Sequence, residues 1–213
     1  MKIEILLSLL LLLTLLRIAI SSRLEVYLKM LSFQGLLLCC LSLMIVEHGS
    51  TFTMIVAIIE TLLLKAIFVP YYLKKVIIQH HVKREAEPYL PNLFSLLIVI
   101  GCIIIGMIGA YHLQIAIKEI KMLIFGVGIT LILCGMFIIL SRKKLITHVM
   151  GFCIMENGIF LLTLGIAHEL PLMVSLGVAL DAFIWVLLSG ILVKLIRIEF
   201  KDNSIEQLKD LRY

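Results

Sequence analysis

The sequence is poor in charged residues: only 15% of its 213 residues are Asp, Glu, Lys or Arg, whereas an average soluble domain has about 25%. This scarcity excludes an ordinary soluble domain. No folded basic face remains to bind nucleic acid, so the net charge of +5 needs another explanation. Short segments that alternate between polar and apolar residues, as in a transmembrane β-barrel, are also missing.

Residues that usually hold a cofactor are equally scarce. The five cysteines lie inside long apolar runs and do not have the spacing of a metal or iron–sulfur site. The six histidines fall at the ends of these runs or in loops, and there is no glycine-rich phosphate loop. We therefore expect no metal, no cofactor and no catalytic centre, so the chain is not expected to be an enzyme by itself.

Long apolar runs are what the sequence has instead. Hydrophobic residues make up 62% of the chain, and the mean hydropathy is +1.16. Runs near twenty residues are long enough to cross about 30 Å of hydrocarbon as a helix. The sequence predicts an all-α, polytopic membrane protein with about seven transmembrane helices, at residues 3–20, 26–46, 52–78, 92–112, 122–141, 148–167 and 172–197.

The basic residues predict the orientation of these helices, because Lys and Arg gather on the cytoplasmic side. Fifteen fall on one side and three on the other, and Lys65 lies inside a span. The N-terminus is expected outside and the C-terminus in the cytoplasm of a multi-pass protein of the cytoplasmic membrane. The fifteen residues are Arg17, Arg23, Lys29, Lys74, Lys75, Lys83, Arg84, Arg142, Lys143, Lys144, Lys194, Arg197, Lys201, Lys209 and Arg212, and the three are Lys2, Lys118 and Lys121.

Two stretches of the chain resemble each other. In each, a polar residue in the middle of a helix is followed by an acid in the next helix, Gln34 by Glu60 and Glu156 by Asp181, at separations of 26 and 25 residues. Such repeats are common in transporters. We predict a first three-helix unit at 1–80, a loop and spacer helix at 81–121, a second three-helix unit at 122–200 and a cytoplasmic tail at 201–213.

Four ionisable side chains fall well inside predicted helices: Glu60, Lys65, Glu156 and Asp181. Residues of this kind are rare at such depth and usually face a bundle interior or a wet cavity. Counted at about 1.5 Å per residue from the turn between them, Glu156 and Asp181 lie at nearly the same depth. Two carboxyl groups at one level can hold and exchange a proton. Static hydrogen bonds and ion pairs between helices are the alternative.

The neighbours of Glu156 suggest how its helix is oriented. Asn157 would place a hydrogen-bond donor and acceptor beside the acid. Glycines recur every seven residues on the face roughly opposite the acid, which predicts close helix contacts there. These glycines are Gly151, Gly158 and Gly165.

Lys65 follows Glu60 by five residues, which places the two side chains about 140° apart on an α-helix. A direct ion pair between them would then need long side-chain reach or a bend at Pro70. Pro70 has no N–H to donate to residue 66, so a carbonyl near Lys65 is expected to be free of its usual helical partner.

These motifs resemble a known family. The segment "GFCIMENG", followed about 25 residues later by "LGVALDAF", resembles the E component of hydrogenase 4 and of related formate hydrogenlyase complexes. The segments "FQGLLL" and "AIIETLLLKAIFVP" are similar to that family's Gln-containing helix and its Lys-x-x-x-x-Pro helix. The C-terminal half also resembles the K subunit of respiratory complex I and the C subunit of multi-subunit cation/proton antiporters. By motif position, Glu156 and Asp181 match the two membrane glutamates of the K subunit.

The resemblance implies a non-catalytic membrane subunit on a proton-translocation path. Its expected partners are antiporter-like and complex I-like membrane subunits and a peripheral nickel–iron hydrogenase arm. Asp181 is one methylene shorter than glutamate, and Gln34 replaces the matching acid of the first copy, which argues against a second complete proton path there. A subunit of a cation/proton antiporter without a redox partner and a structural membrane scaffold remain alternatives.

Overall fold

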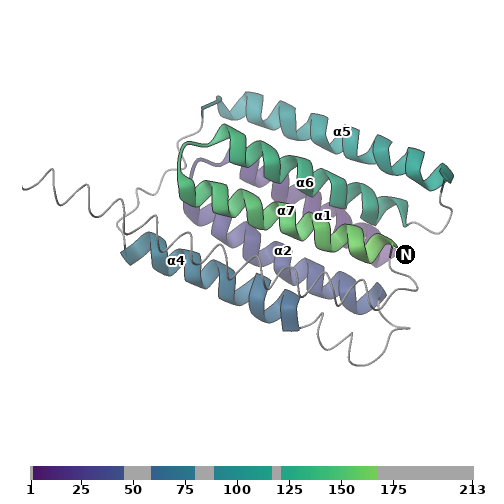
Figure 1. Cartoon of the computed structure of the whole chain (residues 1–213), viewed down its shortest axis with the longest axis horizontal. Helices are drawn as coiled ribbons and strands as arrows, with labels where there is room; N and C mark the ends of the chain where they lie inside the picture. Colours follow the sequence, from purple (N-terminus) through teal and green to yellow (C-terminus); the bar gives the residue numbers. More distant parts are fainter. Residues whose placement is uncertain (1, 46–58, 80–88, 117–120, 167–213) are drawn as a thin grey trace, which may run out of the picture. The chain divides into compact units, whose positions relative to one another are not determined.

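The computed structural model of the chain describes residues 2–45, 59–79, 89–116 and 121–166. All of them belong to one compact unit, Met1–Val178. Every regular element in these ranges is a helix (Figure 1). The elements are α1 (Lys2–Ile20), α2 (Leu24–Ile45), η1 (Ile59–Phe68), α4 (Val69–Gln79), α5 (Asn92–Ala116), α6 (Met122–Ser141) and α7 (Leu145–Ile166).

Five of the described helices are long and apolar enough to cross a membrane, and they are Lys2–Ile20, Leu24–Met44, Asn92–Ile115, Met122–Ser141 and Leu145–Gly165. Hydrocarbon cannot satisfy backbone N–H and C=O groups, so an apolar run pairs them internally as a helix. The chain is therefore a multi-pass membrane protein, and five predicted spans are confirmed as helices. The predicted spans 52–78 and 172–197 lie partly and wholly outside the described residues, so the count of seven and the domain boundaries stay predictions.

Two helices are longer than predicted. α5 begins beside Pro91 and continues to Ala116, past the predicted end at residue 112, and α7 begins at Leu145 instead of residue 148. The added turns contain Gln114 and Thr147, which lower the local hydropathy. Polar residues at a membrane surface shorten an apolar run without ending a helix, because the backbone hydrogen bonds continue into water.

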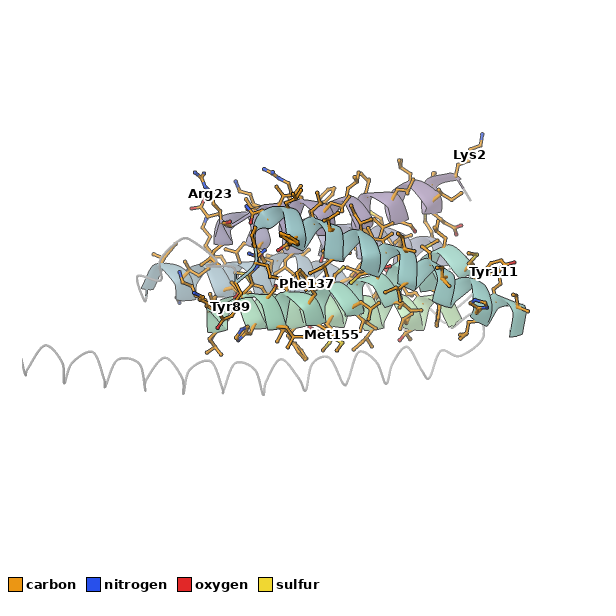
Figure 2. All side chains as sticks on the ribbon, turned by 90° about the horizontal axis from the view of Figure 1, so that it is seen from above. Lys2, Arg23, Tyr89, Tyr111, Phe137 and Met155 are labelled. Atoms are coloured by element: carbon orange, nitrogen blue, oxygen red, sulfur yellow. The ribbon has the colours of Figure 1, made fainter. Side chains whose placement is uncertain are left out.

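At one end of the helix bundle, α1, α6 and α7 contact one another. Figure 2 shows Lys2 and Arg23 at opposite ends of α1. Lys121, just before α6, places its Nζ 3.2 Å from Oε1 of Glu4 in α1. The backbone nitrogen of Lys121 also donates to the carbonyl of Gly165 near the end of α7, at 3.3 Å. The starts of α1 and α6 and the end of α7 therefore share one end.

The opposite end joins α1, α2, α5 and α6. Ser22 Oγ donates to Oδ1 of Asn92 at 3.4 Å. The buried Arg142, which follows α6, donates from Nη2 to the carbonyl of Ala19 at 3.5 Å, and its Cζ lies 5.9 Å from the centroid of the Tyr27 ring. The two sets of contacts agree with the predicted alternation of the helices. Which end faces the cytoplasm stays a prediction.

The closest helix pair is α6 and α7, whose ribbons run side by side in Figure 1. A Cβ on Gly158 would lie 2.7 Å from the carbonyl oxygen of Gly128 and 2.8 Å from the nitrogen of Ile132. A Cβ on Gly151 would lie 3.0 Å from the carbonyl oxygen of Gly135. A side chain at either position would collide with α6, so the predicted packing role is confirmed for Gly151 and Gly158, whereas a Cβ on Gly165 would lie at an ordinary contact distance, 3.4 Å from the nitrogen of Phe125.

Candidate functional site

The face of α7 that carries Glu156 turns away from α6. Cys153, Glu156, Asn157 and Phe160 follow the helical spacing of three and four residues, and all four are buried. Glu156 is 2% exposed and Asn157 is 3% exposed. An acid and an amide are thus enclosed in the middle of an apolar helix, where buried polar groups need partners from other helices.

A chain of hydrogen bonds leads from this face across the bundle to α1. Nδ2 of Asn157 donates to Oε1 of Gln34 in α2 at 3.2 Å. Nε2 of Gln34, which is fully buried, donates to Oγ1 of Thr14 in α1 at 2.7 Å. Thr14 in turn donates to the carbonyl of Leu11 at 2.6 Å. Three helices are therefore tied together by polar side chains at one level.

Lys65 approaches the same face of α7 from η1. Its side chain is 5% exposed, and its Nζ lies 4.8 Å from the centroid of the Phe160 ring, a distance at which an ammonium is attracted to an aromatic face. Phe160 lies one helical turn after Glu156 on α7, so the buried amine of Lys65 reaches the face of α7 that carries the buried carboxyl of Glu156. We call Thr14, Gln34, Lys65, Glu156 and Asn157 the polar centre.

Gly35 and Ser32 in α2 explain how Lys65 reaches this position. A Cβ on Gly35 would lie 2.6 Å from the nitrogen of Ala66 and 2.8 Å from the carbonyl carbon of Lys65, so η1 can approach α2 only at a glycine. Oγ of Ser32 donates to the carbonyl of Ala66 at 2.5 Å. Along an α-helix this is the carbonyl to which residue 70 would donate, and Pro70 has no N–H to do so; the Ser32 hydroxyl is a donor to it from another helix.

The prediction that Glu60 and Lys65 are about 140° apart is wrong because it assumed an α-helix. Residues 59–68 form the π-helix η1. A π-helix bonds residue i to residue i+5, so positions 60 and 65 are one turn apart. The side chain of Glu60 lies outside the described part of the chain. π-Helical turns are rare and occur frequently at functional sites.

The structure brings together four of the residues singled out by sequence: Gln34, Lys65, Glu156 and Asn157. Asp181 lies outside the described residues, so its predicted depth beside Glu156 stays a prediction. Sequence reasoning missed three contributors. Each is an isolated polar or aromatic residue within an apolar run, a weak signal that could have identified them; they are Thr14, Ser32 and Phe160.

Chemically, the polar centre combines two ionisable groups with three neutral hydrogen-bonding groups. It contains one carboxyl, one amine, two amides and one hydroxyl, all buried. Within the described ranges, no group of three or more His, Cys, Asp or Glu side chains could hold a metal ion.

Comparisons with known proteins found two kinds of protein with similar sequences. No family model matches, and no solved structure matches. Uncharacterized protein Rv0085 from Mycobacterium tuberculosis is 26% identical over 189 residues, which cover 86% of this chain and 84% of that protein. Hydrogenase-4 component E from Escherichia coli strain K12 and from Shigella flexneri is 32% identical over 62 residues, which cover 29% of each chain. The likeness to hydrogenase-4 component E thus spans less than a third of that protein.

Proposed function

We propose that this chain is a non-catalytic subunit of a membrane-bound nickel–iron hydrogenase complex of the hydrogenase-4 or formate hydrogenlyase type. The polar centre contributes Glu156 and Lys65 to a proton-translocation path, which Asp181 and Glu60 extend. In this proposal the redox chemistry takes place in other subunits. The partners of the chain are antiporter-like and complex I-like membrane subunits and a peripheral hydrogenase arm, assembled in the cytoplasmic membrane.

The burial of Glu156 and Lys65 at the same face of α7 is the observation that carries this proposal. A proton that moves from the Lys65 ammonium to the Glu156 carboxylate converts two opposite charges into two neutral groups, and the return transfer restores the charges. The charged pair is costly to desolvate but is stabilised by mutual attraction. The neutral pair has neither the desolvation cost nor the attraction. Because these costs oppose each other, a small change in the surroundings can shift the proton between the two groups.

The choice of complex depends on the partial likeness to hydrogenase-4 component E and on the motif resemblance to the complex I K subunit. The genes beside this one test that choice. Genes for the large and small subunits of a nickel–iron hydrogenase support the proposal, and so does their co-purification with a tagged version of this chain from native membranes. A cluster and a purified complex that contain only antiporter subunits would replace it with the antiporter function.

Glu156→Gln tests the proton role in the complete complex. The substitution retains the approximate shape of the side chain and removes its titrating proton. We expect normal assembly and hydrogen turnover, with proton translocation per hydrogen lowered by about tenfold or more, the usual scale of a lost acid–base group. Asp181→Asn is expected to act in the same direction. Translocation is measured in proteoliposomes that contain the purified complex.

Thr163→Val is the matched control on the same helix, because the Thr163 hydroxyl bonds only to the carbonyl of Ile159 one turn away, outside the polar centre. It should leave the proton-to-hydrogen ratio unchanged. If Glu156→Gln and Asp181→Asn both assemble and pump at the wild-type ratio, the acids only hold the helices together and the scaffold function is correct.

A further inference from the structure

In the hydrogen bonds that join α7, α2 and α1, the donor and the acceptor of each bond are fixed by Thr14 at the end of the series. The Thr14 hydroxyl has a single proton, and it is donated to the carbonyl of Leu11 at 2.6 Å. The oxygen of Thr14 can therefore only accept from Gln34. This places the NH₂ group of Gln34 towards Thr14 and its carbonyl towards Asn157, whose NH₂ group is the donor. All three bonds are donated towards α1, and the chain ends on a backbone carbonyl.

This direction fixes the orientation of Asn157. Because its Nδ2 donates to Gln34, its Oδ1 occupies the other position of the planar amide. A reversed Asn157 would set two carbonyl oxygens against each other in a buried site, where unsatisfied polar groups are costly. Gln34 and Thr14 thus hold the side-chain amide of Asn157, the residue next to Glu156, in a single orientation.

The same groups cannot pass a proton onwards. A relay needs groups that accept and release protons at accessible pH, and side-chain amides do neither. Gln34 and Asn157 are both amides, and they separate Glu156 from Thr14. Lys65, which reaches the polar centre from η1 beside Phe160, carries an amine that can gain or lose a proton.

We propose that Gln34 and Thr14 are positioning residues that form a closed wall of the polar centre: they hold Asn157 in one orientation and block proton movement from Glu156 towards α1. Protons at Glu156 therefore exchange with groups other than these two, of which Lys65 is the titratable one within the described part of the polar centre. This inference depends on the proposed function, because it assigns the direction in which Glu156 can exchange its proton.

Gln34→Glu is the substitution that opens the wall. The new carboxyl group can accept a hydrogen bond from Asn157 and, when protonated, donate one to Thr14 as Gln34 does. It places a titrating group where the chain has a neutral amide. In proteoliposomes containing the complete complex without substrate, we expect passive proton permeability to rise above that of the wild-type complex. Hydrogen turnover continues, and the pH profile of proton translocation gains a further ionisation.

Thr14→Val and Thr14→Ser form a matched pair that keeps the inference testable if Gln34 variants do not assemble. Valine has nearly the shape of threonine but cannot bond to Gln34, whereas serine keeps the hydroxyl. Thr14→Val should lower the proton-to-hydrogen ratio and alter its pH profile, and Thr14→Ser should restore both. A role confined to helix packing would leave the pH profile of Thr14→Val complexes unchanged.

Glu156→Gln, measured in the same assays, distinguishes failure of the proposed wall from failure of the proposed function. If it stops translocation while Gln34→Glu stays as proton-tight as wild type and Thr14→Val keeps the wild-type pH profile, the wall is rejected and the proposed function stands. If Glu156→Gln pumps normally, both are rejected.

Discussion

The two faces of α7 hold their neighbours by opposite means. On the face towards α6, Gly151 and Gly158 leave the backbones in direct contact, and the fit depends on the absence of side chains. On the face towards α2 and η1, Glu156 and Asn157 are buried, Asn157 is hydrogen-bonded to Gln34 of α2, and Lys65 of η1 contacts the ring of Phe160. Lipid is as apolar as a helix surface, so association in a membrane depends on close packing and polar contacts. α7 uses close packing on the face towards α6 and polar contacts on the face towards α2 and η1.

The difference shows how a charged group can be placed accurately inside a membrane. The glycine face makes α6 and α7 a closely fitted pair that does not depend on polar groups. The polar face can then carry groups that change protonation state without loosening that pair. We expect variants on the glycine face to affect assembly and variants on the polar face to affect chemistry.

The largest loss is expected from Gly158→Leu. A leucine there would collide with the backbone of Gly128 and Ile132, which cannot move aside without separating the helices. Overpacking of this kind costs about 1–3 kcal/mol or more. The amount of assembled complex in the membrane, measured by immunoblot of native gels, should fall severalfold.

Gly101→Leu is the matched control for that loss, because a Cβ on Gly101 in α5 meets nothing within 4 Å. It should assemble at the wild-type level. Equal losses in the two variants would mean that leucine harms any glycine position in these helices, and the special role of the α6–α7 contact would be rejected.

Gly35→Ala should have an intermediate effect on the polar side. The added methyl would meet the backbone of Lys65 and Ala66 and push η1 away from α2, at a cost of about 1–3 kcal/mol. Because Lys65 would move with η1, the proton-to-hydrogen ratio should fall in complexes that still assemble. Gly101→Ala is the control, and a normal ratio in assembled Gly35→Ala complexes would show that the position of Lys65 is unimportant for translocation.

The smallest effect is expected from Ser32→Ala, which removes the donor to the carbonyl of Ala66. Hydrogen bonds between membrane helices average about 0.6 kcal/mol, so the thermal unfolding of the detergent-solubilised complex should shift only slightly. Pro70→Ala provides the matching test, because it restores an N–H near this carbonyl. Ser32→Ala should cost less in the Pro70→Ala background than alone, and an equal cost would separate the Ser32 contact from the proline.

Part of the polar centre could be predicted from sequence alone. Glu156 and Lys65 were identifiable because an ionisable residue in a long apolar run stands out whatever surrounds it. The packing role of Gly151 and Gly158 followed from their seven-residue spacing, which is a property of one helix. The α-helical angle between Glu60 and Lys65 was wrong, since no local pattern distinguishes the π-helix η1 from an α-helix of the same composition.

The sequence by itself determined that the chain is a multi-pass helical membrane protein and which helices carry polar groups, because both properties follow from the length and content of single apolar runs. Only the tertiary structure decided which of those groups meet. Gln34 and Asn157 are 123 residues apart, and Lys65 reaches Phe160 from another helix. Apolar helices look alike to each other and to lipid, so the hydropathy pattern does not select neighbours. That selection is made where a glycine admits a backbone or where a buried donor finds its acceptor.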